Sequence, residues 1–349
     1  MNIAGVASAF PRHQYDQRVL LSALQRHWGP KVDNPVFLER LQARVGVETR
    51  HLALPIEEYY GLTSWGRANN HWIEVAQEIG QNALCCALSR AGLAPSDLGA
   101  LFFVSVTGIS SPSIDARLVN RMRLPVNIKR IPIFGLGCVA GAAGIARAAD
   151  YVRAYPGQVA AVLSVELCSL TLQQDDTSIA NIISSGLFGD GAAAVLVAGS
   201  DRQSDGPAIL ATRSVFYPDS EHVMGWDISE RGFRIVLSRE VPEVIHDHLA
   251  EDVDAFLEEH GLARSDIGAW VLHTGGPRVL EATAAALELP DGALDASWDC
   301  LRRTGNLSSA SVLVVLEEFM TKRRPAPGTY SILAAMGPGF CSELVLLRW

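Results

Sequence analysis

Apolar runs of strand length alternate with stretches of helical periodicity along most of the chain. In the first half, an N-terminal strand ends at Pro11, and further strands are expected at 98–106, 131–134, 158–166 and 192–198. Helices are expected at 69–92, 115–123, 138–154 and 176–187, and residues 15–45 also have helical spacing, broken at Gly29-Pro30. Strands that alternate with helices in this way are typical of an α/β fold with buried central strands.

The polar segment 199–207 interrupts this alternation and is the expected link between two parts of the chain. After it the pattern restarts, with strands expected at 209–216, 267–272, 330–336 and 341–347 and helices at 240–260, 278–289 and 308–322. We therefore divide the chain into an N-terminal unit, residues 1–205, and a C-terminal unit, residues 206–349.

A short repeat indicates that the two units are duplicates. Each contains a long helix that ends in glycine and continues into a strand, through Gly92-Leu-Ala-Pro-Ser-Asp-Leu98 in one case and Gly261-Leu-Ala-Arg-Ser-Asp-Ile267 in the other. Matching motifs at matching places in two halves favour internal duplication.

Composition limits the class of protein. Of 349 residues, 48% are hydrophobic and 19% charged, which indicates a large core. The net charge of −9 argues against a nucleic-acid-binding protein. The six cysteines form no C-x-x-C motif and no zinc-type cluster, so a reduced, cytoplasmic setting and no metal site are expected. No uninterrupted apolar run reaches membrane-spanning length, and the N-terminus has no basic segment typical of a signal peptide.

Cys138 is the strongest candidate for chemistry. The apolar run before Gly135 predicts a buried strand, and the segment after Cys138, Val-Ala-Gly-Ala-Ala-Gly-Ile-Ala-Arg147, predicts a helix of small residues. A thiol at the N-terminus of a helix lies where the helix dipole stabilises a thiolate. A buried, inert cysteine is the ordinary alternative for a thiol in an apolar run.

Two further residues carry groups that suit a nucleophilic thiol. His273 follows an apolar strand and precedes Thr-Gly-Gly-Pro277, and an imidazole there can support a thiolate or donate to an oxyanion. Asn306, in Gly-Asn-Leu-Ser-Ser-Ala-Ser, precedes a helix, where its amide suits an oxyanion hole or a helix N-cap equally well. Phe188 begins the turn Phe-Gly-Asp-Gly191.

Together these motifs resemble the type III polyketide synthases, the chalcone-synthase-like branch of the thiolase superfamily, over nearly the whole chain. The shared elements are Gly-Cys-x-Ala-Gly, Phe-Gly-Asp-Gly-Ala-Ala, His-x-Gly-Gly-Pro, Gly-Asn-x-Ser-Ser-Ala-Ser and the terminal Gly-Pro-Gly, in the family's order. The resemblance implies a five-layered α-β-α-β-α fold of two duplicated halves, and a homodimer.

The resemblance also implies the reaction. Cys138 would take a starter acyl group from coenzyme A, and His273 would hold its thiolate as an ion pair. His273 and Asn306 would bind the malonyl-CoA carbonyl and favour decarboxylation. The resulting carbanion equivalent would attack the acyl thioester, with no cofactor beyond the CoA substrates.

The expected substrate-binding residues differ from the plant pattern. Phe188 resembles the aromatic gate, Ile235 falls at a second gatekeeper position, and Ser111 stands where a plant Met enters the partner's cavity. Cys168, in Val-Glu-Leu-Cys-Ser-Leu-Thr, resembles the bacterial branch. Further residues expected near the cavity are Thr171, Gly337 and Gly339. These positions suggest an alkylpyrone, an alkylresorcinol or a related small aromatic product.

Three arginines are the residues expected to bind CoA. Arg40, Arg44 and Arg50 lie where the family keeps CoA-binding basic residues.

Three rival functions stay open. An initiating β-ketoacyl-carrier-protein synthase would carry His-Gln-Ala-Asn in place of His273-Thr-Gly-Gly and would need a basic face for its acidic carrier. The other rivals are an acyltransferase without decarboxylation and a catalytically dead partner subunit.

Overall fold

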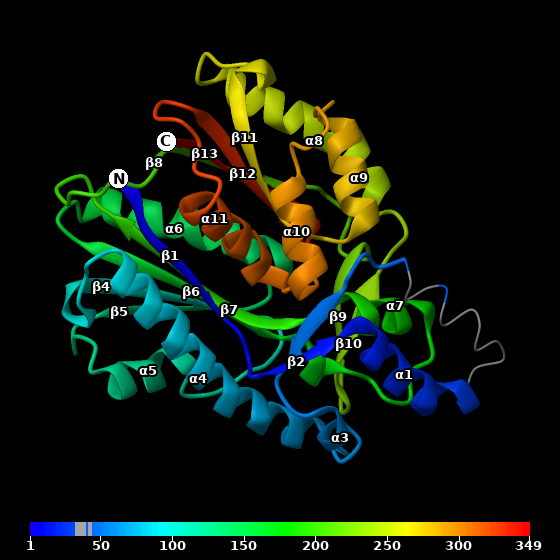
Figure 1. The fold of residues 1–349 in the computed structure, drawn as a ribbon. Helices are drawn as coiled ribbons and strands as arrows, with labels where there is room; N and C mark the ends of the chain where they lie inside the picture. The colour runs from blue at the N-terminus through cyan, green and yellow to red at the C-terminus, as the bar shows by residue number, and fades with distance from the viewer. Residues whose placement is uncertain (32–39, 41–43) are drawn as a thin grey trace.

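A nine-stranded mixed sheet runs through the whole molecule (Figure 1). The computed structural model describes residues 1–31, 40 and 44–349. The strand order is β11-β12-β13-β8-β1-β7-β6-β4-β5. The first-half strands are β1 (Asn2–Ala9), β4 (Leu98–Val104), β5 (Lys129–Ile133), β6 (Val159–Leu167) and β7 (Asp190–Ala198). The second-half strands are β8 (Ala208–Phe216), β11 (Ile267–Leu272), β12 (Tyr330–Gly337) and β13 (Cys341–Arg348).

The strand order confirms that the two halves are duplicates. From the middle of the sheet outward, the N-terminal half has the order β1, β7, β6, β4 and the C-terminal half has the order β8, β13, β12, β11. Each half therefore places its first strand innermost, followed by its last strand and then the strand before the last. The halves meet at β1 and β8, which pair only through Asn2 and Ala208. The repeat forms matching 3₁₀ turns, in which Asp97 and Asp266 each accept a bond of 2.8 Å from a backbone N–H three residues earlier.

Three helix layers and the two halves of the sheet make five layers. Helices α6 (Ala140–Ala154) and α11 (Ser311–Thr321) lie in the middle and pack against strands of both halves (Figure 1). Helices α4 (Trp65–Arg90) and α5 (Ile114–Met122) cover the outer face of the first half. Helices α8 (Val241–Glu258) and α9 (Pro277–Ala286) cover the outer face of the second half. Ten of the fifteen residues of α6 are Ala, Gly, Ile or Val side chains fully inside the protein, which explains how this helix fits between two sheets.

Smaller elements surround one end of the central helices. They are β2 (His13–Asp16), α1 (Gln17–Trp28), β3 (Thr49–Leu52), α3 (Ile56–Tyr59), α7 (Ile179–Leu187), β9 (Met224–Ser229), β10 (Gly232–Leu237) and α10 (Asp295–Thr304). The pattern did not predict β2, β3, β9, β10 or α10. These strands have only four to six residues each, so any alternation in them is too short to be recognised in the sequence. The helix expected over 15–45 ends at Trp28, and most of its remainder lies outside the described residues.

The strand before Cys138 differs from the expectation in one respect. β5 was expected to be buried, but it lies at the edge of the sheet, pairs only with β4, and is largely exposed. An apolar run such as Ile131-Pro-Ile-Phe134 does not distinguish an edge strand from a central one, although Pro132 is typical of an edge. The boundary predicted at 205/206 lies between β7 and β8, and its reading as a domain boundary stays a prediction.

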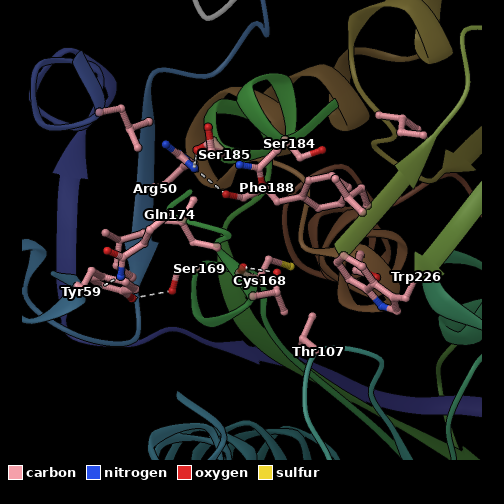
Figure 2. A pocket seen from close by; sticks show the side chains of 18 of the residues that line it. Arg50, Tyr59, Thr107, Cys168, Ser169, Gln174, Ser184, Ser185, Phe188 and Trp226 are labelled. Atoms are coloured by element: carbon pink, nitrogen blue, oxygen red, sulfur yellow. Dashed lines mark hydrogen bonds between the residues drawn. The ribbon is translucent and has the colours of Figure 1, made fainter. Parts of the chain in front are cut away.

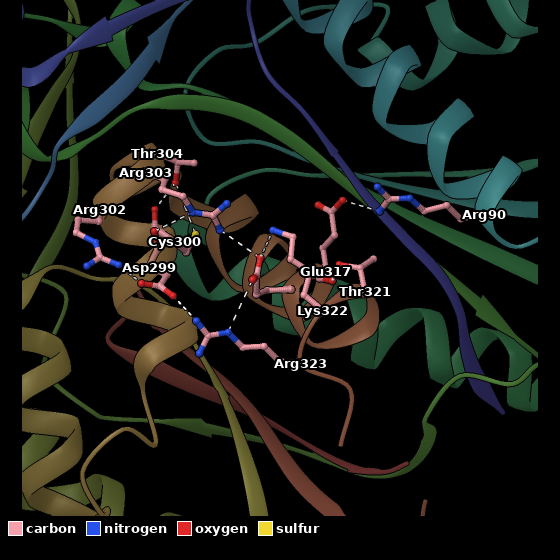
Figure 3. Close-up of polar contacts among 11 residues, drawn as sticks. Arg90, Asp299, Cys300, Arg302, Arg303, Thr304, Glu317, Thr321, Lys322 and Arg323 are labelled. Carbon is pink, nitrogen blue, oxygen red and sulfur yellow. Dashed lines mark hydrogen bonds and ion pairs between the residues drawn. The ribbon is translucent and has the colours of Figure 1, made fainter. Parts of the chain in front are cut away.

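Ion pairs join α10 to the end of α11 (Figure 3). The turn that carries Asn306 connects these two helices in the chain. Glu318 on α11 binds Arg303 of α10 at 3.2 Å and Lys322 at 3.0 Å. Arg323 bridges Glu318 and Asp299. Because Glu318 is mostly buried while its partners are half exposed, this network fixes the two helices relative to each other more firmly than isolated surface pairs do.

Candidate active site

Cys138 lies where the sequence predicts, in a single 3₁₀ turn (Gly137–Val139) that leads into α6. Its side chain is 6% exposed, and its thiol donates to Ser308 Oγ at 3.6 Å. Glycines on either side allow the close packing. A Cβ at Gly141 would lie 2.2 Å from the Ser309 carbonyl, and one at Gly337 would lie 2.7 Å from Val139 N. Gly337 therefore packs against the Cys138 turn. Gly339 lies near Phe216 and Cys341 instead, and neither glycine lines a chamber.

Asn306 follows α10 and precedes the 3₁₀ turn Ser308–Ala310. Its Oδ1 accepts from Ser308 N at 2.8 Å and from Ser311 Oγ at 3.4 Å, and its Nδ2 donates to the Gly275 carbonyl at 3.4 Å. The oxygen therefore caps the turn, as the N-cap interpretation predicts. The bond from Nδ2 to the Gly275 carbonyl is long and therefore weak, so Nδ2 can form a shorter hydrogen bond to a substrate oxygen, which the oxyanion-hole interpretation requires.

His273 directly follows β11, at the strand C-terminus that the sequence predicts. Its backbone N–H donates to Ala334 O at 3.0 Å, which fixes the residue against β12. The side chain is 8% exposed, and its Nδ1 has no hydrogen-bond partner among the described residues. A buried ring nitrogen of this kind is typical of a group that meets its partner during a reaction.

Burial changes the acidity of both candidate catalytic side chains. Burial raises the pKa of the Cys138 thiol to about 12; the Ser308 hydrogen bond opposes this and the nearby Glu166 carboxylate adds to it. Burial lowers the pKa of His273 to about 4. Taken singly, each group is therefore neutral near pH 7, and the helix position of Cys138 does not by itself produce a thiolate.

Two apolar chambers meet at Cys138. The outer chamber, with a volume of about 570 Å³, brings together Cys138, His273 and Asn306. The inner chamber, of about 140 Å³, extends from Cys138 toward α1 and α3 (Figure 2). Both are lined by Cys138, Phe188, Met224 and Leu237. The half-buried Phe188 therefore stands at the boundary between the chamber lined by His273 and Asn306 and the chamber that lacks these two residues.

The inner chamber contains most of the residues expected to bind substrate. Cys168 and Thr171 come from the 3₁₀ turn after β6 (Cys168–Thr171), and Ile235 comes from β10. Burial raises the pKa of Cys168 well above its ordinary value, with Glu166 and Asp190 adding to the effect, so this thiol is neutral. Ser111 is exposed and lies outside both chambers.

The three arginines expected at CoA have different positions. Arg44 is exposed and lines the outer chamber, as a CoA-binding residue would. Arg40 is exposed and lines neither chamber. Arg50 is 3% exposed and hydrogen-bonded inside the protein. Its expected role is therefore corrected: it cannot reach a solvent-exposed phosphate, because alternation along β3 turns its side chain inward.

Sequence reasoning missed two arginines of the outer chamber. Arg239 and Arg278 line it, are exposed, and have no ion-pair partner among the described residues. Arg278 directly follows the Gly-Gly-Pro segment, so its proximity to His273 was a usable signal. Arg239 precedes α8 and gave none, because only the folded chain brings it to the chamber that His273 lines.

The described part of the chain contains no group of three or more His, Cys, Asp or Glu side chains close enough to hold a metal ion. In the same residues, no helix is long and apolar enough to span a bilayer.

Comparison with known proteins identifies relatives along the full chain. Residues 43–202 and 208–349 match the family models for the N-terminal and C-terminal domains of chalcone and stilbene synthases. A 1,3,6,8-tetrahydroxynaphthalene synthase of Streptomyces peucetius subsp. caesius is 50% identical, over 100% of this chain and 93% of that protein. A phloroglucinol synthase of Pseudomonas fluorescens is 33% identical, over 97% of each chain. The crystal structure of 1,3,6,8-tetrahydroxynaphthalene synthase from Streptomyces coelicolor A3(2), a bacterial type III polyketide synthase, superposes with a TM-score of 0.95 at 31% identity, covering 100% of this chain and 99% of that one.

Proposed function

Because the chain belongs to the chalcone and stilbene synthase family of type III polyketide synthases, we propose that it extends a CoA-bound acyl starter by decarboxylative condensation with malonyl-CoA. One observation carries the proposal at the level of the site. A buried thiol, an imidazole and a side-chain amide line one chamber, and an apolar chamber continues beyond the thiol.

The first step loads the enzyme. The Cys138 thiolate attacks the starter thioester carbonyl, and CoA leaves as a thiol after taking up a proton. His273 is the group in the outer chamber that accepts the Cys138 proton. Transfer of this proton creates two opposite charges in a dry site, and each stabilises the other against the burial that disfavours it alone.

The second step forms the carbon nucleophile. Malonyl-CoA loses carbon dioxide, and the electron pair of the broken bond becomes an enolate whose oxygen carries the charge. His273 and the Nδ2 group of Asn306 donate to this oxygen. The enolate carbon then attacks the acyl thioester, the Cys138 thiolate leaves, and a β-ketoacyl-CoA two carbons longer is released for another round.

The growing chain then enters the inner chamber, whose walls are mainly apolar. We propose that cyclisation gives a small polyhydroxylated aromatic product. The 50% identity to a tetrahydroxynaphthalene synthase favours a product assembled wholly from malonyl units over an alkylated one. The inner chamber, at about 140 Å³, also has about a quarter of the volume of the outer one, at about 570 Å³, which suits a compact product.

The test is turnover of labelled malonyl-CoA by purified protein, alone and with short-, medium- and long-chain acyl-CoA starters, followed by mass spectrometry. We expect carbon dioxide release and an aromatic product from malonyl-CoA alone. Stable loading of a starter on Cys138 with no extension would instead identify an acyltransferase, and the proposed function would fail.

The unpaired arginines of the outer chamber give a prediction about CoA. Arg239 and Arg278 have no ion-pair partner in the described part of the chain, and they line the same chamber as the catalytic groups, as binding of the CoA phosphates requires. The double variant Arg239→Gln/Arg278→Gln should raise KM for malonyl-CoA by about tenfold and leave kcat within about twofold. The reason is that the two arginines bind the CoA phosphates equally strongly in the ground state and in the transition state.

A substrate without the nucleotide provides the control. With a malonyl thioester of N-acetylcysteamine, which has no phosphates, wild type and the double variant should have equal KM values. An equal rise in KM with both substrates would show that the arginines act on the shape of the chamber and not on CoA.

Three further features belong to the proposal. We propose a homodimer, because β5 is a largely exposed edge strand and the segments that flank it and its neighbour β4 expose the apolar side chains Ile109, Val126 and Phe134. Ser111 is exposed two residues after Ile109. Light scattering would show the dimer, and a monomeric mass would contradict it.

We also propose that the protein acts in the cytoplasm and needs no cofactor apart from its CoA thioester substrates.

A further inference from the structure

Arg50 has a buried guanidinium directed at the turn that carries Phe188. Its Nη1 donates to the carbonyls of Ser185 at 2.7 Å and Phe188 at 2.6 Å (Figure 2). Its Nε donates to Gln17 Oε1 at 3.0 Å. Gln17 in turn donates from Nε2 to the Gly186 carbonyl at 2.8 Å. The carbonyls of Ser185, Gly186 and Phe188, at the end of α7, therefore accept hydrogen bonds from the side chains of Arg50 and Gln17.

The aliphatic part of Arg50 touches the turn that carries Asn306. A Cβ added to Gly305 would lie 3.1 Å from Arg50 Cδ and 3.2 Å from Arg50 Cγ. Gly305 also has a positive φ of +72°. Only a glycine allows the Arg50 side chain to pass this close to the residue before Asn306.

The two turns are also bonded to each other. Asn306 N donates to Leu187 O at 2.9 Å, and Gly189 N donates to Asn306 O at 3.0 Å. Phe188 is the residue between these two bonds. Its carbonyl is held by Arg50 from one side, while its neighbours are held by Asn306 from the other.

The charge of Arg50 persists in this buried position. Burial lowers its pKa to about 10, opposed by the nearby Asp190, so the guanidinium is protonated near pH 7. Asp190 is itself fixed by accepting from Ala53 N at 2.6 Å and Ser169 N at 2.8 Å. The turn 188–190 is thus held at both ends by charged, buried side chains, an arrangement that costs desolvation and strongly restricts movement.

We propose that Arg50 is a positioning residue that fixes Phe188 at the boundary of the two chambers and so controls passage of the growing chain from the outer chamber to the inner one. This inference rests on the proposed function, because it concerns the intermediate that the function generates. Arg50 lines the inner chamber, but its hydrogen bonds all go to the backbone of the turn and to Gln17, so we assign it a positioning role and not a catalytic one.

The experiment compares Arg50→Met, Arg50→Lys and Gln17→Met with wild type. Loss of the guanidinium leaves two carbonyls without their donor, and the Phe188 turn loosens. For Arg50→Met we expect the ratio of truncated to fully extended product to rise by about tenfold, while KM for malonyl-CoA stays within about twofold. Arg50→Lys should restore part of the wild-type ratio, because an ammonium reaches the carbonyls but lacks the planar fork that also holds Gln17.

Arg213→Met is the matched control. Like Arg50, Arg213 donates to a backbone carbonyl, that of Asp252 at 3.5 Å, and it also pairs with Glu259, but it lies on β8 and lines neither chamber. Its loss should lower stability and leave the product ratio unchanged.

The outcomes separate the two proposals. If wild type releases no carbon dioxide from malonyl-CoA, the proposed function fails. If wild type makes the product and the folded Gln17→Met variant gives the wild-type product ratio, the positioning role is overturned, even where the Arg50 variants change the ratio, because Arg50 lines the inner chamber and Gln17 lines neither chamber. If Arg50→Met does not fold, Arg50→Lys and Gln17→Met decide, because each removes only part of the same set of bonds.

Discussion

Replacing Cys138 by Ala is expected to abolish product formation while leaving decarboxylation of malonyl-CoA in place. The thiol is the acceptor of the starter, so its loss should lower the rate of extended product by about 10⁴-fold or more. Carbon dioxide release depends on His273 and Asn306, which line the outer chamber independently of the Cys138 side chain. The two activities are measured together with malonyl-CoA labelled in its carboxyl carbon and by mass spectrometry of the products.

Asn306→Asp is the complementary variant. An Asp side chain keeps the oxygen that accepts from Ser308 N, and it replaces the Nδ2 donor by a second acceptor. The bond from Ser308 N is therefore kept, while the donor to the enolate and the long bond to the Gly275 carbonyl are lost, and carbon dioxide release should fall by about 10²- to 10³-fold. Acyl loading on Cys138 should persist, as seen by intact-protein mass.

Opposite losses in the two variants would establish that loading and decarboxylation use different groups of one chamber. Loss of carbon dioxide release in folded Cys138→Ala would contradict this division, because it would make the thiol part of the decarboxylation site. The same extent of decarboxylation in Asn306→Asp and wild type would remove Asn306 from the proposed mechanism.

The sequence predicted the main strands and helices because their burial follows a simple period. β6 and β7 are buried along their whole length and are read directly as apolar runs. The same reasoning placed Cys138 before a helix and His273 after a strand, and both positions are confirmed. β5 shows its limit, because an apolar strand at an edge has the same composition as a central one.

The electrostatic state of the site was beyond the reach of the sequence. A helix N-terminus favours a thiolate, but the structure shows that burial dominates and raises the pKa of Cys138. Desolvation depends on every neighbour in three dimensions and outweighs the partial charge of a single helix end. Arg50 illustrates the same limit, because a basic residue on a short strand gives no sign in the sequence of whether it faces solvent or the interior.

His273→Gln is expected to remove the reactivity of Cys138 toward iodoacetamide at neutral pH. Glutamine keeps a polar side chain of similar reach but cannot accept the thiol proton. With the pKa of a buried thiol at about 12, the group is neutral below that pH, and the thiolate fraction falls tenfold for each pH unit below it. In the variant, alkylation should therefore rise steadily with pH across the accessible range.

In wild type, transfer of the proton to His273 supplies a thiolate without raising the pH. Cys138 alkylation near pH 7 should then be about 10²-fold faster than in His273→Gln and should level off over the neutral range. The Cys138 peptide is followed by mass spectrometry, since Cys85 and Cys86 are exposed and also react. Their modification provides an internal control, because its pH dependence should be the same in both proteins.

The comparison of the two profiles decides how the site overcomes burial. A plateau in wild type and a steep rise in His273→Gln would show that the imidazole carries the thiol proton, although burial alone disfavours the charged form of each partner. The same steep rise in both proteins would mean that Cys138 stays a thiol until substrate enters. In that case His273 would serve only as a hydrogen-bond donor to the enolate, and proton transfer to it in the free enzyme would be ruled out.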